Sequence, residues 1–384
     1  MNRRRRVCPW RIAAGLIAVA LIASACGAST PTTAAPSPTE VSPTTANPQS
    51  TATSAPTAGP LVVLEWSGYE LPEFWQPFAD KYPDVLVDYS FFAEDAEAYA
   101  KMQTGFQTDV VHPCSSWWTL YVDAGLVLPI DTSRLKNWSG LIEPLVKEGH
   151  IDGKQYFVPW DWGYESILVR TDKVSVVPDS WADLWDPQYA GHVALWDSGE
   201  SNHAMTALAL GLAPMATTPE QDVQIKQKLI EIKPNLVTYW ADYTEAVQLA
   251  LSGDAWLIAN AWPDAYKLAI DEGANPDTLA YIEPKEGRLG WLCGYGISSN
   301  AKNVDLAYAY LDALIAPESM AALANEYAYG AANAEALPLT DPDFVALMQL
   351  DQPDILERTV FLGSLTAEQQ KNFTSMWADV KAAP

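Results

Sequence analysis

Five short segments of the sequence place an aromatic residue beside an acid or a hydroxyl group. Aromatic faces attract ammonium groups by about 0.5–2 kcal/mol each. A carboxylate about 4 Å from a cation contributes about 4 kcal/mol at an effective dielectric near 20. Each segment alone is explained by core packing or by a helix cap, but together they indicate a site for a flexible diamine or polyamine. The segments are Trp66-Ser67-x-Tyr69, Trp160-Asp161-Trp162, Trp196-Asp197-x-x-Glu200, Trp262-x-Asp264 and the region of Trp291.

Residues for catalysis are harder to find. The four histidines lie at 112, 150, 192 and 203 and follow no recognisable motif, and the G-x-S-x-G, P-loop and H-E-x-x-H patterns are absent. Paired carboxylates among tryptophans could describe a glycosidase, but such a pair serves binding equally well. The cysteines lack the spacing of a metal site. We therefore expect a binding protein with no catalytic residue, no cofactor and no metal.

The charge excludes one class of partner. The 384 residues include 48 acids and 23 lysines and arginines, a formal net charge of −25. Nucleic-acid binding needs clustered basic residues, so we expect no nucleic acid as partner. An acidic field attracts cations, although most of these acids serve solubility.

Residues 153–170 are the stretch that must position these groups. Trp160, Trp162 and Tyr164 alternate there with Asp161 and Glu165 between two β-strand patterns. Pro159 and Gly163 make this a poor core strand. We interpret the stretch as a crossing between two lobes that faces a cleft; a surface strand is the alternative.

The order of predicted elements favours two α/β lobes. Strands at 61–66, 85–91 and 109–111 alternate with helices at 73–82 and 93–106, which predicts a parallel sheet with ligands at the carboxyl ends of its strands. Further strands at 192–196 and 256–260 and helices at 201–212, 219–232, 242–252 and 265–273 form a second lobe. Residues 290–298 are expected to cross back. The predicted boundaries are 61–163 with 292–328 for lobe 1, and 164–291 with 329–384 for lobe 2.

The N-terminal region has the layout of a secretory signal. Arginines at 3–6 and 11 precede an apolar run at 12–22 that is short for a membrane span. Ala23-Ser24-Ala25-Cys26-Gly27 resembles the lipobox of bacterial lipoproteins. We expect 1–25 to be a lipoprotein signal peptide and Cys26 to carry the lipid. Residues 26–60, rich in Thr, Pro, Ala and Ser, are expected to be a disordered tether.

The chain resembles the periplasmic spermidine/putrescine-binding proteins of ABC importers over most of residues 61–384. The resemblance lies in segments such as Glu65-Trp66-Ser67-Gly68-Tyr69, Ser180-Trp181-x-Asp183-Leu184-Trp185 and Pro284-Lys285-Glu286-Gly287. It implies a two-lobed, periplasmic binding protein-like fold. Each lobe would be a mixed sheet flanked by helices, with crossing strands between the lobes, and the lobes would close on the ligand.

The resemblance also implies ligand contacts, to which we add Asp161 and Trp162 of the crossing. Cys293 replaces an aspartate that holds an ammonium in the family, no residue near Leu362 matches a family glutamine, and Asp161 is an acid that the family does not lead us to expect. The expected ligand-binding residues are Trp66, Ser67, Tyr69, Cys114, Ser115, Ser116, Asp161, Trp162, Asp197, Glu200, Trp262, Asp264, Trp291 and Tyr329.

Cys114 and Cys293 would both lie in lobe 1 near this site. In an oxidising compartment they could form a disulfide on the cleft floor, and two buried thiols are the alternative.

The function that follows is an extracytoplasmic solute-binding lipoprotein that delivers a polyamine or related organic cation to an ABC permease. It would be a monomer in the periplasm or at the outer face of the cytoplasmic membrane, held there by its lipid alone. Binding of a sugar or other neutral solute is one alternative, because tryptophan also stacks on pyranose rings. A secreted carboxylate-based hydrolase is the other.

Overall fold

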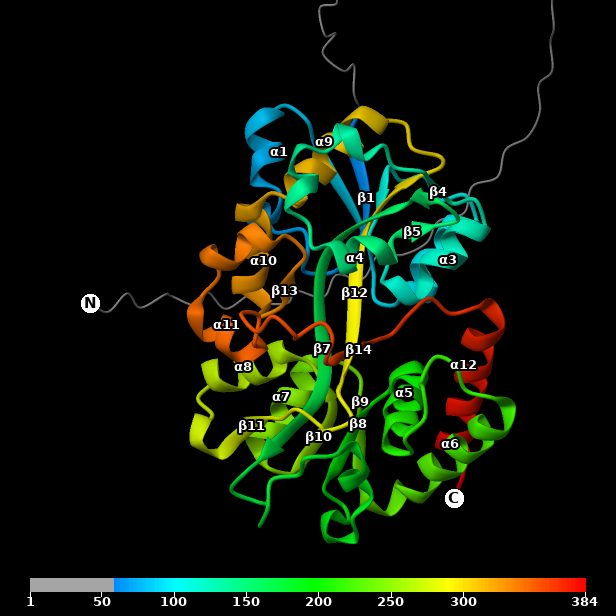
Figure 1. Ribbon diagram of the computed structural model, residues 1–384, viewed down its shortest axis with the longest axis vertical. Coiled ribbons are helices and arrows are strands. Elements are labelled where there is room, and N and C mark those ends of the chain that lie inside the picture. The colour runs from blue at the N-terminus through cyan, green and yellow to red at the C-terminus, as the bar shows by residue number, and fades with distance from the viewer. Residues whose placement is uncertain (1–58) are drawn as a thin grey trace, which may run out of the picture. The chain divides into compact units, whose positions relative to one another are not determined.

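The computed structural model describes residues 59–384. The predicted signal peptide (1–25), Cys26 and nearly all of the predicted tether (26–60) lie outside the described residues, so these assignments stay predictions. Figure 1 shows two groups of helices and strands joined by long strands. Within residues 59–384, no helix combines the length and the apolar character needed to cross a membrane.

Lobe 1 is built on the strands expected from the start of the sequence. β1 (Leu61–Trp66) is parallel to β2 (Val87–Phe92) and β3 (Val110–Val111), and β3 is antiparallel to β12 (Arg288–Ser298). The core of this lobe includes Phe78, Trp118 and Tyr310, all fully buried. Its other elements are α1 (Gln76–Lys81), α2 (Asp95–Gln103), α3 (Ser115–Asp123), β4 (Val127–Leu128), α4 (Glu143–Glu148), β5 (His150–Ile151), β6 (Lys154–Gln155), α9 (Val304–Leu314), α10 (Pro317–Tyr327), β13 (Gly330–Ala331) and α11 (Pro342–Met348).

Lobe 2 follows the predicted order closely. β8 (Val193–Trp196) lies between β9 (Leu236–Trp240) and β10 (Leu257–Ala261), and both pairs are parallel. β11 (Leu279–Tyr281) pairs antiparallel with β7. The helices are α5 (Gly199–Ala209), α6 (Pro219–Glu231), α7 (Tyr243–Ser252), α8 (Pro263–Asp271) and α12 (Ala367–Ala382).

The predicted crossing is the single strand β7 (Phe157–Arg170), paired antiparallel with β12 from one lobe into the other. In Figure 1 the two strands run side by side through the middle of the molecule. Pro159 does not break β7, because it lies where the register shifts between Cys293 and Gly294 of β12. Proline is tolerated at such a bulge, where its missing N–H costs little. The fold is therefore the expected α/β arrangement of two lobes joined by crossing strands.

A third connection shifts the expected lobe boundary. We expected residues 329–384 in lobe 2, but Ala332, Ala336 and Met348 pack in the core of lobe 1. The reason is that β13 pairs with β7 beside lobe 1, which turns the following helical segments back onto that lobe. The chain then returns along β14 (Thr359–Phe361), which is parallel to β12, and reaches lobe 2 at α12.

Candidate ligand-binding site

The crossing strands define the face on which a ligand can lie. Directly opposed residues of an antiparallel pair point to the same face, and successive residues of a strand alternate between faces. Three opposed pairs share one face of these strands, which combines acids with a tryptophan. We call this face the ligand face. The opposed pairs are Asp161 with Cys293, Gly163 with Trp291 and Glu165 with Leu289.

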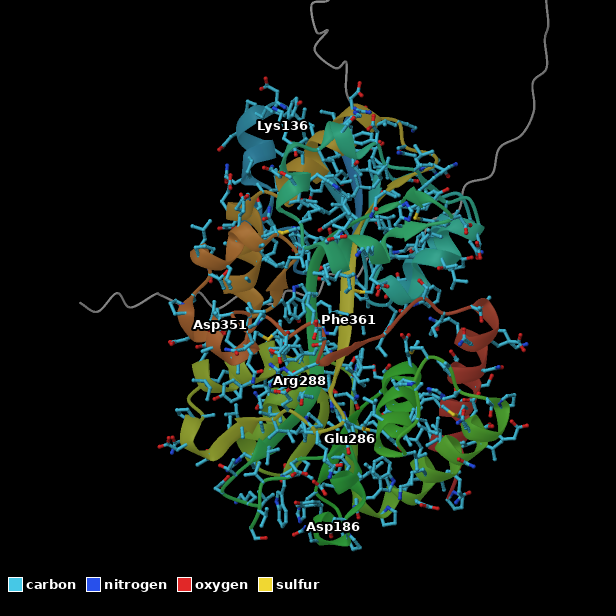
Figure 2. All side chains as sticks on the ribbon, in the orientation of Figure 1. Lys136, Asp186, Glu286, Arg288, Asp351 and Phe361 are labelled. Atoms are coloured by element: carbon cyan, nitrogen blue, oxygen red, sulfur yellow. A yellow bond between two sulfur atoms is a disulfide. The ribbon has the colours of Figure 1, made fainter. Side chains whose placement is uncertain are left out.

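Trp162, a predicted contact, lies on the other face of β7. Its side chain is 2% exposed, and its ring packs 6.2 Å from that of Phe361 between centroids. Arg288 lies on this face too, with its guanidinium 4.3 Å from the ring centroid of Tyr164; Figure 2 labels Phe361 and Arg288 in this central region. The prediction that Asp161 and Trp162 both face the ligand does not hold for Trp162, because neighbours along a strand point to opposite faces.

Trp291 and Tyr329 form one wall of the ligand face. Their ring centroids are 4.7 Å apart in an edge-to-face contact. Gly163 makes the wall possible, because a Cβ at that position would lie 2.5 Å from the Trp291 ring. The Tyr329 hydroxyl donates to Oδ2 of Asp264 over 2.9 Å, which connects this wall to α8 of lobe 2.

Two polar atoms of this wall lack partners. Oδ1 of Asp264 and Nε1 of Trp291 are buried and make no hydrogen bond among residues 59–384. An unsatisfied buried polar group costs roughly 1–3 kcal/mol, so Oδ1 of Asp264 indicates where a donor of the ligand would bond, whereas the Trp291 N–H would need an acceptor. Burial raises the pKa of Asp264 to about 7, although Tyr329 donates a hydrogen bond to it.

Asp161 belongs to a buried network that the sequence did not reveal. Its Oδ1 lies 3.2 Å from Nε2 of His112, whose Nδ1 lies 2.6 Å from Oε1 of Glu65. The Tyr69 hydroxyl donates to Oδ2 of Asp161 over 3.2 Å. Burial lowers the pKa of His112, but Glu65 and Asp161 outweigh that effect and raise it to about 9. The imidazolium therefore neutralises one of the two acids and leaves one net negative charge, while both oxygens of Asp161 already have a protein partner.

Glu165 is a site candidate absent from the predicted contacts. Its side chain is buried, and it accepts hydrogen bonds from Ser201 of α5 and from the amide of Asn260 in β10, both over 2.9 Å. Burial raises the pKa of Glu165 to about 8. The signal was present in the sequence, because Glu165 follows Asp161 by four residues and must share its face in a strand.

The predicted serines lie at the start of α3, and the cysteine pair lies between α3 and β12. Cys114 and Cys293 form a disulfide, which is one of the two alternatives that the sequence left open. Ser115 donates to the carbonyl of Leu362 over 3.1 Å, so the third connection lies against the start of α3. Ser116 is next to Glu200 of lobe 2, and burial raises the pKa of Glu200 to about 7.

The charge of Glu200 in lobe 2 also acts on Asp95 of lobe 1. Asp95 accepts a hydrogen bond from the Cys114 backbone over 3.0 Å, and its pKa is raised to about 8 by burial and, less strongly, by the charge of Glu200. Asp95 is a second candidate missed in the sequence, where it reads as an ordinary acid in the first turn of a helix.

Asp197 pairs with residues of the C-terminal helix α12. Its Oδ1 accepts hydrogen bonds from the Trp377 indole over 2.6 Å and from Lys381 over 2.7 Å. The predicted role of Asp197 as a ligand-facing acid does not fit this geometry, because a cation of the protein already pairs with it. Ser67, also predicted, is exposed at the end of β1.

Two predicted aromatic contacts make no ring contact with Trp291 or Tyr329 in the described residues. Trp66 donates from its indole to the carbonyl of His112 over 2.8 Å and packs 4.5 Å from Phe92 between ring centroids. Trp262 lies 4.8 Å from Trp196 and 5.5 Å from Trp240 between ring centroids. Trp262 nevertheless immediately precedes the helix that presents Asp264.

The site as a whole is acidic without a basic partner. Glu165, Asp264, Asp95 and Glu200 form no salt bridge with a lysine or arginine anywhere in residues 59–384. Glu165 and Asp264 are buried, whereas Asp95 and Glu200 are half-buried. Buried carboxylates are normally paired, protonated or bound to a cation. The arrangement is therefore suited to a positively charged ligand that binds between the lobes.

The model of one protein family, the bacterial extracellular solute-binding proteins, matches residues 74–350 of this chain. The chain belongs to this family. Solute-binding proteins are transport components that bind small ligands, and buried acids where two lobes meet agree with that role.

Named relatives of this solute-binding protein are similar over most of its length. The spermidine/putrescine-binding periplasmic protein of Escherichia coli (strain K12) is 28% identical over 290 residues, which cover 74% of this chain and 80% of that protein. The putrescine-binding periplasmic protein SpuD of Pseudomonas aeruginosa (strain UCBPP-PA14) is 26% identical over 344 residues, covering 84% and 92%.

Solved structures share the fold. The spermidine/putrescine substrate-binding protein PotD from Streptococcus pneumoniae matches with a TM-score of 0.73 at 21% identity, covering 85% of this chain and 99% of that one. MotA from A. tumefaciens B6, in complex with glucopine, matches with a TM-score of 0.67 at 23% identity, covering 84% and 100%.

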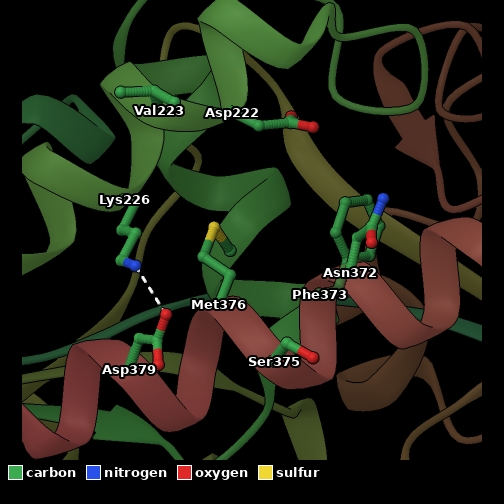
Figure 3. Close-up of a pocket in the computed structure, with 8 residues that line it drawn as sticks. All are labelled: Asp222, Val223, Lys226, Asn372, Phe373, Ser375, Met376 and Asp379. Atoms are coloured by element: carbon green, nitrogen blue, oxygen red, sulfur yellow. Dashed lines mark hydrogen bonds and ion pairs between the residues drawn. The ribbon is translucent and has the colours of Figure 1, made fainter.

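Two surface grooves of this solute-binding protein are lined by none of the ligand-face residues. One, of about 230 Å³, lies between α6 and α12, where Lys226 donates to Asp379 over 2.6 Å; Figure 3 shows this ion pair between the two helices. The other, of about 440 Å³, lies between β9 and α7 and includes Tyr239 and Gln248. Neither groove contains an unpaired buried acid, so the interlobe residues remain the better ligand site.

Proposed function

We propose that this chain is the extracytoplasmic receptor of an ABC importer and binds a polyamine or a related small organic cation between its lobes. The observation that carries the proposal is the pair Glu165 and Asp264, two buried acids without a basic partner among residues 59–384. A bound ammonium group would supply the missing charge. The names of relatives that bind spermidine and putrescine support the same ligand class.

The aromatic residues of the gap complete the proposed site. Trp291, Tyr329 and Tyr69 offer ring faces and edges to the methylene groups of such a ligand. The disulfide stands where the resemblance leads us to expect an ammonium-holding aspartate. We therefore propose that Glu165 and Asp264 replace that acid in holding the ligand's charge.

Calorimetric titration with putrescine, spermidine and maltose tests this function. Saturable binding of an amine at micromolar or lower Kd, without turnover, is the expected result. Binding of maltose alone would assign the gap to a neutral solute. Release of a hydrolysis product would assign the protein to the enzymes.

We further propose that the protein is attached to the membrane by lipid on Cys26 and works as a monomer with permease subunits. Cys26→Ser should move the protein from the membrane fraction to the soluble fraction. Cys8→Ser is the matched control and should leave it in the membrane. Retention of the Cys26→Ser protein in the membrane would contradict a lipid anchor.

A further inference from the structure

We infer that the Cys114–Cys293 disulfide is a redox-sensitive latch between the two lobes. As a disulfide it holds the first turn of α3 against residues 362–365, the chain that leads into α12 of lobe 2. Its reduction to two thiols releases that contact. The effect of the latch on ligand release rests on the proposed function, whereas the contact between the lobes does not.

Three hydrogen bonds join the first turn of α3 to residues 362–365. The Ser115 hydroxyl donates to the carbonyl of Leu362 over 3.1 Å, and the Ser364 hydroxyl donates to the carbonyl of Ser115 over 2.8 Å. The backbone N–H of Leu365 donates to the carbonyl of Ser116 over 2.9 Å. Because the bonds run in both directions, each segment fixes the position of the other.

The two segments belong to opposite lobes. Trp118 and Tyr121 of α3 are part of the core of lobe 1, whereas Leu362 packs in the core of lobe 2 together with Trp377 of α12. In Figure 1 the chain passes from β14 to α12 beside α3. The three hydrogen bonds are therefore contacts between the lobes.

The disulfide fixes this turn of α3 on the lobe 1 side. Cys114 is the N-cap residue of α3, and its sulfur is bonded to Cys293 of β12 instead of capping the helix. The register of β12 against β7 shifts between Cys293 and Gly294, so the strand ladder is irregular beside the disulfide. A covalent bond at this point restricts the movement of α3 relative to the crossing strand.

Hydrogen bonds also hold this turn to lobe 1, but they open far more readily than a covalent bond. The backbone N–H of Cys114 donates to Asp95 over 3.0 Å, and that of Gly294 donates to the carbonyl of Pro113 over 3.2 Å. A thiol is a weak acceptor, so reduced Cys114 would cap α3 poorly. Neither cysteine belongs to the hydrophobic core of lobe 1, so reduction should loosen the turn without unfolding the lobe.

The latch opens by thiol–disulfide exchange with a dithiol reductant. A thiolate of the reductant attacks Sγ of Cys114, because Cys114 is half-buried whereas Cys293 is 6% exposed. The bond between the two protein sulfurs breaks, and Cys293 leaves as a thiolate that takes up a proton. The second sulfur of the reductant then displaces Cys114, which also becomes a thiol, and the reductant closes to a cyclic disulfide.

Ligand release should become faster when the latch opens. A ligand held between the lobes leaves when the lobes separate, so a contact that joins them slows dissociation more than association. The oxidised protein should therefore retain its ligand longer than the reduced protein.

Amide hydrogen exchange at Leu365 in the ligand-free, full-length protein tests the latch itself. In the oxidised protein, Ser115→Ala should speed this exchange at least tenfold, and the exposed Ser139→Ala, also on lobe 1, is the matched control without effect. In the protein reduced with dithiothreitol, Ser115→Ala should change the exchange rate less than threefold, because the contact is already released. An equal effect of Ser115→Ala in both redox states, or no effect in the oxidised protein, would overturn the latch.

The double variant Cys114→Ser/Cys293→Ser separates the disulfide from other effects of the reductant. It should behave like the reduced protein with or without dithiothreitol. Because it keeps Cys8 and Cys26, a response of this variant to dithiothreitol would place the redox effect elsewhere and overturn the inference. If the double variant does not fold, the comparison of Ser115→Ala in the oxidised and reduced protein decides the matter.

Stopped-flow measurement of putrescine dissociation tests the effect of the latch on the ligand. The reduced protein should release putrescine at least fivefold faster than the oxidised protein, with an association rate changed less than twofold, and reoxidation should restore slow release. Equal dissociation rates in the two states would overturn control of the ligand by the latch. If neither state binds putrescine, the proposed function fails, while the exchange at Leu365 still decides whether the latch exists.

Discussion

At the scale of single residues, the site is distinguished by acids that lack a partner rather than by the number of acids. Asp197 and Asp264 are both aspartates at the start of a lobe 2 helix or the loop before it. Asp197 pairs with Lys381 and Trp377, whereas Oδ1 of Asp264 is left without a bond. The sequence predicted both equally, because it does not show which acid meets the distant C-terminal helix.

This contrast gives a paired prediction. Asp264→Asn should weaken putrescine binding at least tenfold, or about 1.4 kcal/mol, because the ammonium loses a buried anionic acceptor. Asp197→Asn should change the affinity less than threefold. Both Kd values are measured by calorimetry at one pH. The reverse order of effects would place the ligand near Asp197 instead.

His112 is the residue on which the buried network of lobe 1 depends. Its replacement leaves Glu65 and Asp161 buried without a cation between them. His112→Gln should therefore lower the free energy of unfolding by about 3–5 kcal/mol. Urea denaturation measures the loss, and the exposed His150→Gln is the matched control with less than about 0.5 kcal/mol. A change below 1 kcal/mol for His112→Gln would contradict the charged network.

At the scale of elements, the crossing strand could be placed from the sequence but not fully interpreted. The alternation of acids and aromatics in 153–170 predicted a strand between lobes, and β7 is that strand. The same alternation requires Asp161 and Glu165 to share a face that Trp162 does not. The opposite strand could not be aligned from the sequence, because the bulge at Pro159 sets the register with β12.

Gly163 tests the packing of this strand against β12. A Cβ there would lie 2.5 Å from Trp291, so Gly163→Ala must displace the indole. We expect a loss of about 1–3 kcal/mol in the free energy of unfolding, together with weaker amine binding. Gly363→Ala is a control, because a Cβ at Gly363 would meet nothing within 4 Å. Unchanged stability and affinity in Gly163→Ala would contradict the role of Trp291 as a wall.

The disulfide ties the start of α3 to the crossing strand β12. It joins residues 179 apart in the sequence, so it restricts a long segment of the unfolded chain. Replacing both Cys114 and Cys293 with serine should lower the free energy of unfolding by about 2–5 kcal/mol. Urea denaturation of the oxidised protein, the reduced protein and the double variant measures this. The reduced protein and the variant should agree, and a variant as stable as the oxidised protein would contradict the prediction.

At the scale of the whole molecule, the unpaired acids make stability depend on pH in an uncommon direction. The pKa of Glu165 is raised to about 8 and that of Asp264 to about 7, mainly by burial. In the unfolded chain both groups titrate near pH 4. The folded protein therefore binds more protons than the unfolded chain between about pH 5 and 8, and its stability falls as pH rises through this range.

Thermal denaturation of the ligand-free protein at pH 5, 6, 7 and 8 checks this. The Tm should fall with increasing pH. Saturating putrescine should reduce the fall, since an ammonium stabilises the ionised acids. Asp264→Asn should also show a shallower slope, because one of the titrating groups is removed. A Tm that rises steadily from pH 5 to 8 would show that other groups control stability.

The two-lobed architecture itself was largely accessible from the sequence, because alternating strand and helix patterns are local. The lobe boundary after 328 was not, because it depends on β13 pairing with β7 far away in the chain. The buried network of Glu65, His112 and Asp161 could not be predicted for the same reason. Glu65 and His112 are 47 residues apart, and no local pattern brings them together.

The alternation of side chains along β7 also determines how the ligand preference of this protein could be redesigned. Positions 165 and 291 can be varied to alter the ligand face, whereas Asp161, Gly163 and Cys293 are held by the His112 network, the Trp291 ring and the disulfide, and 162 and 164 support the aromatic core. Substitution is the workable route, because inserting or deleting one residue ahead of Asp161 would exchange the two faces and carry both carboxylates into that core.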